Sequence, residues 1–331
     1  MAGIVIIGGG QAGGEAAYAL RQAEYGGDLT IIGDEQHIPY ERPPLSKGLL
    51  IGDNEPADTY LREHSVYDAC NIDLKLDVSV TSIDRSGKGV ELSDGSALAY
   101  DKLLIATGAR ARRLDLPGGD LENIFYLRNI ADSLALREAL SPGTKLVVIG
   151  GGYIGLEVAA SARKRGCDAC VVEVADRIMN RVVALEMSEH FDAVHRSAGV
   201  DIRTGTTVDA IDGNARVREL TLSDGSLITA DVVVIGIGIV PNLELAEAAG
   251  LDIDNGIKVD EYGHTGDPDI FAAGDVTNHY NPILGRCLRL ESWQNAQNQA
   301  IAASRNMAGG EAVHAEIPWF WSDQYDINLQ M

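Results

Sequence analysis

The chain has 331 residues, of which 45% are hydrophobic and 23% charged. This composition is typical of a globular protein, and the length predicts two or three domains. The formal net charge of −22 argues against nucleic acid and anionic membrane surfaces as partners. No apolar run is long enough to cross a bilayer. Four cysteines without a secretory leader indicate reduced thiols in the cytoplasm.

A glycine-rich loop near the N-terminus is the first motif along the chain. It follows a short apolar run, has the spacing G-x-G-x-x-G, and leads into a helical pattern. That order predicts a buried parallel strand, a tight turn and a helix whose free N–H groups face a pyrophosphate. An ordinary strand–turn–helix unit is the alternative, and the complete context disfavours it. The glycines are Gly8, Gly10 and Gly13.

A second apolar run, residues 29–32, ends beside two acidic residues, Asp34 and Glu35. They lie at about the distance from the glycines at which a carboxylate binds the ribose hydroxyls of a dinucleotide. Together with the loop, this run predicts a complete dinucleotide-binding unit.

Residues 37–50, HIPYERPPLSKGLL, contain three prolines. We therefore predict an irregular, stiff segment rather than the start of a helix. Arg42 and Lys47 flank the proline pair, so the segment carries two cations on a rigid loop.

A strand is predicted over residues 74–83, and the pair Asp94-Gly95 between alternating apolar residues predicts a hairpin. The next buried strand ends in Ala106, Thr107 and Gly108.

The same pattern then occurs a second time. Residues 145–157, KLVVIGGGYIGLE, contain another G-x-G-x-x-G loop, and the following strand, 169–172, ends on Glu173. A second hairpin repeats the residues of the first, Leu-Ser-Asp-Gly-Ser, beginning at Leu222 instead of Leu92. Two ordered copies predict two similar dinucleotide-binding domains. The second loop contains Gly150, Gly152, Tyr153, Ile154 and Gly155.

Three further segments follow the second copy. Residues 270–275, IFAAGD, predict a short strand that ends at an acidic residue, and residues 290–303 have a helical pattern. Residues 318–331 contain two of the three tryptophans and end in what we interpret as the first strand of a further unit.

With both loops, RPPLSK, ATG, IFAAGD, ESWQNA and WFWSDQ, the chain resembles the FAD-dependent, NADH-oxidising ferredoxin reductases of bacterial oxygenase systems. The resemblance runs from Ile4 to Met331. It implies an α/β fold of the glutathione-reductase type, with two Rossmann-like domains and only the start of a C-terminal α+β domain. The implied division is an FAD domain at 1–112 and 244–317, an NAD domain at 113–243, and the truncated domain at 318–331.

The resemblance also implies which residues bind the cofactors. Val80 would offer backbone groups to the adenine, Asp275 would bind the ribityl chain, and Trp293 would lie near the flavin pyrimidine. Trp321 is the candidate for the aromatic ring over the flavin, with Trp319 second. The FAD set is Gly8, Gly10, Ala12, Gly13, Asp34, Glu35, Arg42, Lys47, Val80, Ala106, Thr107, Gly108, Arg128, Gly274, Asp275, Trp293 and Trp321. The NAD set is Gly150, Gly152, Tyr153, Ile154, Gly155, Glu157, Glu173 and Gly238.

Lys47 and Glu157 are the candidate catalytic residues. The resemblance implies that Lys47 lies beside the reactive edge of the flavin, and Glu157 follows directly after the second loop. We predict an ion pair between them, because burying one charge without the other is costly. The alternative is that Glu157 only caps or orients its helix.

Glu173 predicts the coenzyme. A carboxylate at the end of the second strand accepts hydrogen bonds from the ribose hydroxyls of NADH and repels the 2′-phosphate of NADPH. Arg177 nearby could weaken that preference, but an arginine in place of Glu173 would be the clearer sign of NADPH. We therefore predict NADH.

Other possible signals are set aside. Cys167 and Cys170 have C-x-x-C spacing but lie in the second strand of the NAD domain, where residues three apart point to opposite faces. We predict two buried thiols rather than a redox pair, and no metal site. The seven histidines share no spacing and are assigned no role.

The predicted activity is NADH-dependent reduction of a [2Fe–2S] ferredoxin that feeds a cytochrome P450 or a Rieske dioxygenase. Since ferredoxins are usually acidic, a protein of net charge −22 needs a local basic patch, for which Arg286, Arg289 and Arg305 are candidates. Two alternatives stay open: another acceptor such as rubredoxin, or an NADH-switched interaction protein resembling apoptosis-inducing factor. The sequence does not decide between a monomer and a homodimer.

Overall fold

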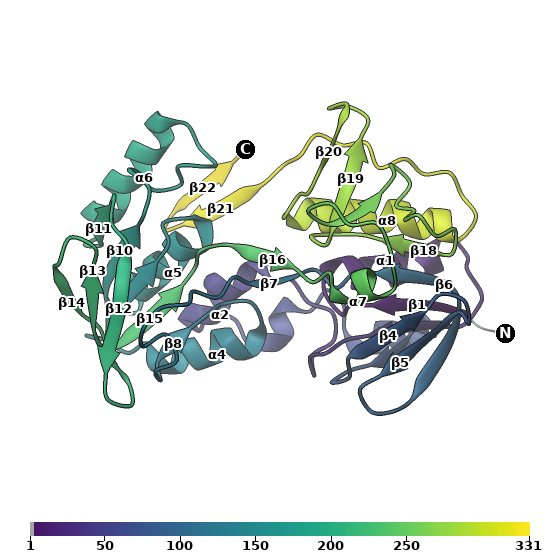
Figure 1. Cartoon of the computed structure of the whole chain (residues 1–331), viewed down its shortest axis with the longest axis horizontal. Helices are drawn as coiled ribbons and strands as arrows, with labels where there is room; N and C mark the ends of the chain where they lie inside the picture. Colours follow the sequence, from purple (N-terminus) through teal and green to yellow (C-terminus); the bar gives the residue numbers. More distant parts are fainter. Residues whose placement is uncertain (1–2) are drawn as a thin grey trace.

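A computed structural model describes residues 3–331 and shows two lobes (Figure 1). A parallel sheet forms the centre of the first lobe, with the strand order β3-β2-β1-β6-β18. All five residues of β1 are buried, as expected for a parallel strand that is covered on both faces. The strands are β1 (Gly3–Ile7), β2 (Leu29–Ile32), β3 (Asp73–Lys75), β6 (Ala97–Ile105) and β18 (Ile270–Ala272).

Two helices that are far apart in the sequence pack together on this sheet, α1 (Gln11–Gln22) and α8 (Trp293–Met307). Their contact surfaces are rich in alanine, which allows the two backbones to approach closely. Ser304 Oγ donates a hydrogen bond to the carbonyl oxygen of Ala16 at 3.0 Å. The first lobe is thus formed from the two ends of the chain, with the second lobe inserted between them.

The second lobe repeats this plan with a parallel sheet of order β11-β10-β9-β15-β8. Helix α5 (Tyr153–Lys164) packs against β9 and β10, and α6 (Leu185–Ser197) packs against β11. Helix α4 (Ile130–Ala139) packs against a short helix of the first lobe, α2 (Gly48–Ile51). The strands are β8 (Ile124–Phe125), β9 (Lys145–Ile149), β10 (Asp168–Glu173), β11 (Asp201–Thr204) and β15 (Val232–Ile235).

The two predicted hairpins are present and have the same geometry. In the first, the Leu92 amide donates to the Ser96 carbonyl at 2.9 Å, and Gly95 has φ of +83°. In the second, Leu222 donates to Ser226 at 2.9 Å. The predicted repeat is therefore confirmed down to the turn. The strands are β4 (Val80–Asp84) and β5 (Gly89–Leu92), which pair with the start of β6, and β12 (Val208–Gly213), β13 (Val217–Leu222) and β14 (Leu227–Thr229).

The lobes are joined by an antiparallel pair of strands, β7 (Ala109–Ala111) and β16 (Ile239–Pro241). The chain leaves the first lobe through β7 and returns through β16. Thr107 and Asn242 brace this crossing with two hydrogen bonds, of 3.0 and 2.9 Å.

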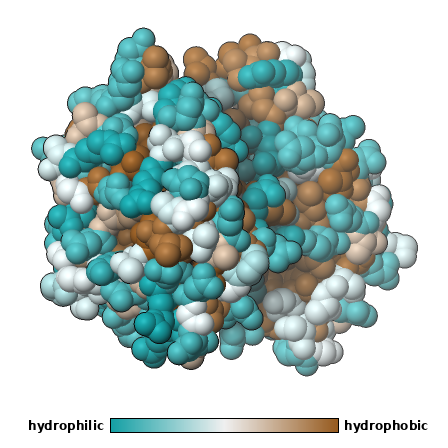
Figure 2. Space-filling view, turned by 60° about the vertical axis from the view of Figure 1, so that its left-hand side comes forward, coloured by the Kyte–Doolittle hydropathy of each residue, from teal (hydrophilic) through white to brown (hydrophobic). Residues whose placement is uncertain are grey.

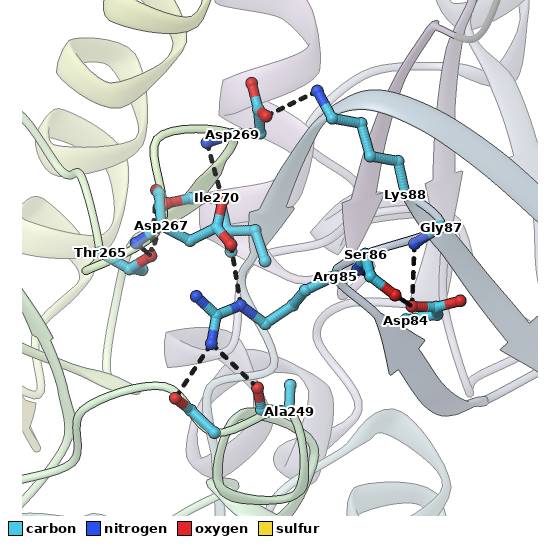
Figure 3. A network of polar contacts seen from close by, with 11 residues as sticks. Asp84, Arg85, Ser86, Gly87, Lys88, Ala249, Thr265, Asp267, Asp269 and Ile270 are labelled. Carbon is cyan, nitrogen blue, oxygen red and sulfur yellow. Dashed lines mark hydrogen bonds and ion pairs between the residues drawn. The ribbon is translucent and has the colours of Figure 1, made fainter.

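The remaining elements cover the first lobe. Arg85, in the turn between β4 and β5, binds Asp267 at 2.8 Å and the carbonyls of Ala249 and Gly250 (Figure 3). Burial opposes ionisation of Asp267, but the Asp269 amide and the Arg85 guanidinium hold its pKa below the usual range. These contacts hold the turn between β4 and β5 against residues 249–267, which follow the return of the chain to the first lobe. The elements are η2 (Pro56–Thr59), α3 (His64–Ala69), α7 (Glu244–Ala248), β17 (Ile257–Val259), β19 (Thr277–Asn281) and β20 (Arg286–Leu288).

A C-terminal hairpin, β21 (Trp321–Gln324) and β22 (Ile327–Gln330), crosses from α8 back to the second lobe. Figure 1 shows it in yellow beside α6, and β21 also contacts α5. Ile327 and Leu329 join the core that contains Phe191 of α6. Strands β21 and β22 therefore pack on the second lobe, although they follow α8 of the first lobe in the sequence.

Three predicted elements differ from the structure. The single strand predicted over 74–83 is wrong: β3 and β4 are separate, because Asp77 has φ of +58°. The segment 37–50 is not wholly irregular, since the 3₁₀ turn η1 (Pro43–Ser46) lies within it and α2 begins in it. Proline is tolerated at the start of such a turn. The C-terminal stretch forms two paired strands rather than one.

No helix in residues 3–331 is long and apolar enough to cross a membrane.

Two buried histidines predict acid sensitivity. His279 and His314 lie 5.0 Å apart between ring centroids, and burial lowers the pKa of each to about 4, with His314 adding to the shift at His279. The unfolded chain, with a histidine pKa near ~6.5, then binds more protons between these values. Stability should therefore fall as pH drops from about 6.5 to about 4, by on the order of 3 kcal/mol per histidine.

Urea unfolding at a series of pH values checks this expectation. His279→Phe should flatten the dependence in that window, whereas His190→Phe, at an exposed position for which residues 3–331 show no ion pair, should leave it unchanged. An unchanged slope in His279→Phe would contradict the assignment.

Candidate active site

A cleft with about 1210 Å³ of empty space lies where the two lobes meet. Figure 2, with the second lobe turned forward, shows the surface hollowed between the lobes. The predicted residues that line the cleft are Gly8, Gly10, Ala12, Asp34, Glu35, Arg42, Lys47, Ala106, Thr107, Gly108, Arg128, Ile154, Glu157, Gly274, Asp275, Trp293 and Trp321.

The other predicted residues lie outside this lining. Gly13 lies beneath the first loop, and Val80 is in β4, paired in register with Leu92 of β5. Those of the NAD set that do not line the cleft are Gly150, Gly152, Tyr153, Gly155, Glu173 and Gly238. The binding roles of these residues stay predictions.

The first glycine loop has no room for side chains at two of its three positions. Gly8 has φ of +121°, and a Cβ there would lie 2.2 Å from the Ala106 carbonyl oxygen. A Cβ on Gly13 would lie 1.9 Å from the Gly8 carbonyl oxygen. Gly10 differs, because its nearest neighbour is an Arg42 nitrogen at 3.9 Å. Its backbone is therefore bare on the side from which a pyrophosphate would approach the N-terminus of α1.

The second loop reproduces this geometry. Gly150 has φ of +111°, and its Cβ would lie 2.4 Å from the Gly236 carbonyl oxygen. A Cβ on Gly155 would lie 2.1 Å from the oxygen of Gly150, whereas Gly152 has nothing within 4 Å. Both loops therefore fit a dinucleotide, each with one glycine that has open space beside its Cα between two that have none.

Buried polar atoms without partners support FAD in the cleft. Arg128 Nη2 contacts Asp275 at 3.1 Å, but its Nε has no hydrogen-bond partner within residues 3–331, and neither does Trp293 Nε1. Burial and the nearby Arg42 guanidinium lower the pKa of Arg128. Two adjacent cations in a cleft favour an anionic ligand, which fits the pyrophosphate of FAD.

Glu35 is held in place at one side of the cleft. It accepts hydrogen bonds from Tyr40 Oη at 2.7 Å and from Arg42 at 3.1 Å. Burial and the Glu35 carboxylate raise the pKa of Tyr40, and Arg42 opposes them. Asp34 is exposed beside it. Each Glu35 oxygen keeps a lone pair, so Glu35 and Asp34 can both still accept hydrogen bonds from a ribose.

Lys47 and Glu157 form the predicted ion pair, with 3.0 Å between Lys47 Nζ and Glu157 Oε2. The Glu157 side chain is only 2% exposed and that of Lys47 is 22% exposed. Two hydroxyl groups also donate to the carboxylate, Ser46 Oγ to Oε2 at 2.5 Å and Ser322 Oγ to Oε1 at 2.6 Å. A buried carboxylate with three donors is stable where an isolated one would not be.

The proline segment is fixed where Lys47 can reach Glu157. Ser161 of α5 donates to the Ser46 carbonyl at 2.6 Å, and Ser133 of α4 donates to the Leu45 carbonyl at 2.7 Å. Helices of the second lobe thus hold a loop of the first. Ser46 and Ser322 are not among the predicted site residues. Both lie in quoted motifs, Ser46 in PPLSK beside Lys47 and Ser322 in WFWSDQ beside Trp321, but neither motif indicates a contact with Glu157.

Glu173 lies at the end of β10, and its side chain contacts the second loop. Its Oε2 accepts from the Gly151 amide at 2.6 Å, and its Oε1 accepts from the Ala175 amide at 2.8 Å. This is the place at which a carboxylate binds the ribose of NAD.

Three aromatic rings gather at the C-terminal hairpin. Trp321 stacks on Trp319 with centroids 5.2 Å apart, and it meets Trp293 edge-on at 5.8 Å. Trp321 lines the cleft, as does Phe320, which the sequence did not single out. Trp319 is not part of the lining.

The two cysteines of the C-x-x-C spacing point to opposite faces of the sheet, as predicted. Cys167 belongs to one hydrophobic core and Cys170 to another, and both thiols are free. Burial, followed by the Asp201 carboxylate, raises the pKa of Cys170 to about 12. Such a thiol is a poor nucleophile near pH 7.

Two dinucleotide-binding units, a cleft where their lobes meet, and an ion pair between Lys47 and the buried Glu157 in its wall are typical of a two-nucleotide reductase. The family model for pyridine nucleotide-disulphide oxidoreductases matches residues 2–300, and the chain belongs to this family. It is an oxidoreductase whose cofactors are FAD and NADH, which confirms the predicted fold and cofactors.

The relatives agree with the resemblance seen in the sequence. Rhodocoxin reductase of Rhodococcus erythropolis is 46% identical, over 99% of this chain and 77% of the relative. The ferredoxin–NAD(+) reductase component of the anthranilate 1,2-dioxygenase system of Burkholderia cepacia is 44% identical, over 99% and 80%. The putidaredoxin reductase in a covalent complex with putidaredoxin superposes with a TM-score of 0.96 at 42% identity, covering 99% of this chain and 80% of that one.

The glycine geometry predicts two kinds of alanine variant. Gly150→Ala should destabilise the fold by about 2 kcal/mol or more, because it combines a clash with backbone strain. Gly152→Ala has space for its methyl group, so its melting temperature should stay within about 2 °C of the parent while KM for NADH rises several-fold. Thermal unfolding and steady-state kinetics check both. Equal melting temperatures for the two variants would refute this reading of the loop.

Proposed function

We infer that the chain is an NADH-dependent ferredoxin reductase, and that its [2Fe–2S] ferredoxin serves a cytochrome P450 or a Rieske dioxygenase. The observation that supports this most directly is the cleft, where the first glycine loop, the Lys47–Glu157 pair and Trp321 lie together. When bound, FAD would accept a hydride from NADH and release electrons singly to the ferredoxin.

The protein's own residues would then bind and orient the cofactors and stabilise the negative charge on the bound ligand. The Lys47 ammonium places a positive charge at the cleft wall, and Glu157 fixes that ammonium at 3.0 Å. Preorganised charge of this kind favours the anionic form of a ligand without further rearrangement. Trp321 supplies a flat apolar wall that excludes water, and Glu173 selects NADH.

The assignments of individual site residues are part of the same proposal. So is the division into segments 1–112, 113–243, 244–317 and 318–331, which the pairing of β7 with β16 and the return of β18 to the first sheet support. We also propose a cytoplasmic location, which the four free thiols favour.

Coenzyme choice tests the role of Glu173. In anaerobic stopped-flow absorbance, NADH should bleach the flavin at least about tenfold faster than NADPH at equal concentration, a difference of about 1.4 kcal/mol. Glu173→Gln keeps the shape and the acceptor oxygen but removes the charge, so it should reduce this ratio several-fold. Equal rates with both coenzymes in the parent protein would contradict the proposed selectivity.

The ferredoxin should depend on local positive charge. Arg289 pairs with Glu291 and is 16% exposed, which leaves Arg286 and Arg305 as the more accessible candidates. Arg286→Glu should raise the apparent KM for an acidic [2Fe–2S] ferredoxin by about three- to tenfold at low salt, and less at high salt.

The control is Arg218→Glu, which makes the same charge change on the exposed hairpin of the second lobe. Equal effects of the two variants would exclude a local patch at Arg286. Substituting rubredoxin for the ferredoxin in this assay identifies the acceptor.

A further inference from the structure

A continuous chain of buried polar groups reaches Glu157 from the far side of the second lobe. Ser322 Oγ lies 2.6 Å from Glu157 Oε1, and Gln324 Nε2 lies 3.1 Å from Ser322 Oγ. His195 Nε2 lies 2.8 Å from Gln324 Oε1, and Tyr325 Oη lies 3.2 Å from His195 Nδ1. Ser322, Gln324 and His195 have no exposed surface.

The hydrogen bonds in this chain can be satisfied in one direction. The carboxylate only accepts, so the single hydroxyl proton of Ser322 points to Glu157, and Ser322 must accept from Gln324. The Gln324 amide nitrogen therefore faces Ser322, and its oxygen accepts from His195. This fixes the proton of neutral His195 on Nε2 and leaves Nδ1 to accept from Tyr325.

The burial of His195 supports the same order of donors and acceptors. Burial lowers the pKa of this ring, against the opposing effects of Gln324 and Asp192, so it is neutral near pH 7. Hydrogen bonds that all point one way polarise each other in a buried site. Every donor in the chain therefore strengthens the bond that reaches the carboxylate.

The chain also joins parts of the protein that are remote in sequence. His195 lies in α6, Gln324 and Ser322 lie in β21, and Glu157 lies in α5. From Glu157 the contacts continue to Ser46 and Lys47 of the first lobe. The two members in β21 are two residues apart, which places both side chains on the same face of the strand.

We propose that Ser322, Gln324 and His195 are positioning residues for the Glu157 carboxylate, and through it for the Lys47 ammonium at the cleft. Ser322 holds Oε1, which leaves Oε2 to Lys47 and Ser46. Gln324 and His195 fix the direction of the Ser322 hydroxyl. The inference rests on the proposed function, because it assigns these residues to the site at which NADH reduces the flavin.

A double-mutant cycle tests this proposal. Ser322→Ala and Gln324→Leu are made in the parent protein and in Glu157→Gln, and NADH-driven flavin reduction is measured by anaerobic stopped flow. A hydrogen bond to a charged group is stronger than one between neutral groups, and part of the effect of losing it is passed on to Lys47. We expect the rate to fall about three- to tenfold in the parent background, and to change less than about twofold in Glu157→Gln.

Two controls accompany the cycle. Ser322→Thr keeps the hydroxyl group and should restore most of the parent rate. Asn328→Ala removes an exposed side chain of the same hairpin that contacts Asp323, and should leave the rate unchanged. Equal losses in both Glu157 backgrounds would mean that the hairpin acts only on the fold, and would overturn the proposal.

Two readouts do not depend on turnover. Histidine ¹⁵N shifts should report protonated Nε2 and bare Nδ1 for His195, and the flavin midpoint potential should be more negative in Ser322→Ala than in the parent. A His195 proton on Nδ1, or an unchanged potential, would overturn the proposal. If NADH fails to reduce the parent flavin, the proposed function fails instead, and the histidine shifts still test the hydrogen-bond chain.

Discussion

The structure depends on keeping one carboxylate, Glu157, charged inside the protein. A buried charge is tolerated only when donors surround it, and Glu157 obtains them from three places in the chain. Ser46 and Lys47 come from a proline-rich loop of the first lobe, and Ser322 comes from the C-terminal hairpin. The need to satisfy a single side chain therefore constrains how the lobes, the loop and the hairpin are placed.

The glycine loops follow from a second constraint, which is the close approach of backbone to backbone. Gly8 and Gly150 have almost the same φ, and in each loop the third glycine lies against the carbonyl of the first. The sequence spacing predicts this geometry directly, because only glycine allows it. The hairpins with Leu-Ser-Asp-Gly-Ser are predictable for the same reason, since their turns are determined by residues adjacent in the chain.

Contacts between distant segments were harder to predict. The Lys47–Glu157 pair is predictable because the resemblance places Lys47 beside the flavin and Glu157 follows the second loop directly. Ser322 and Gln324 also lie in a family motif, WFWSDQ, but that motif indicates only an aromatic ring over the flavin. His195 was assigned no role, since a helix position alone does not reveal a buried partner 129 residues away. The break between β3 and β4 at Asp77 is not predictable from the pattern, because a positive φ at a non-glycine residue has no clear sequence signature.

The C-terminal hairpin has a consequence for how the protein is made. Because Ser322 contacts Glu157 and Trp321 lines the same cleft as Gly8, this cleft is not fully lined until residue 322 has left the ribosome. The second lobe has all of its sheet strands by Ile235 and is free to fold earlier. The first lobe waits for β18 and α8, and the hairpin β21–β22 follows both of them. A nascent chain that has not yet reached Trp321 therefore has both glycine loops but lacks part of the cleft wall.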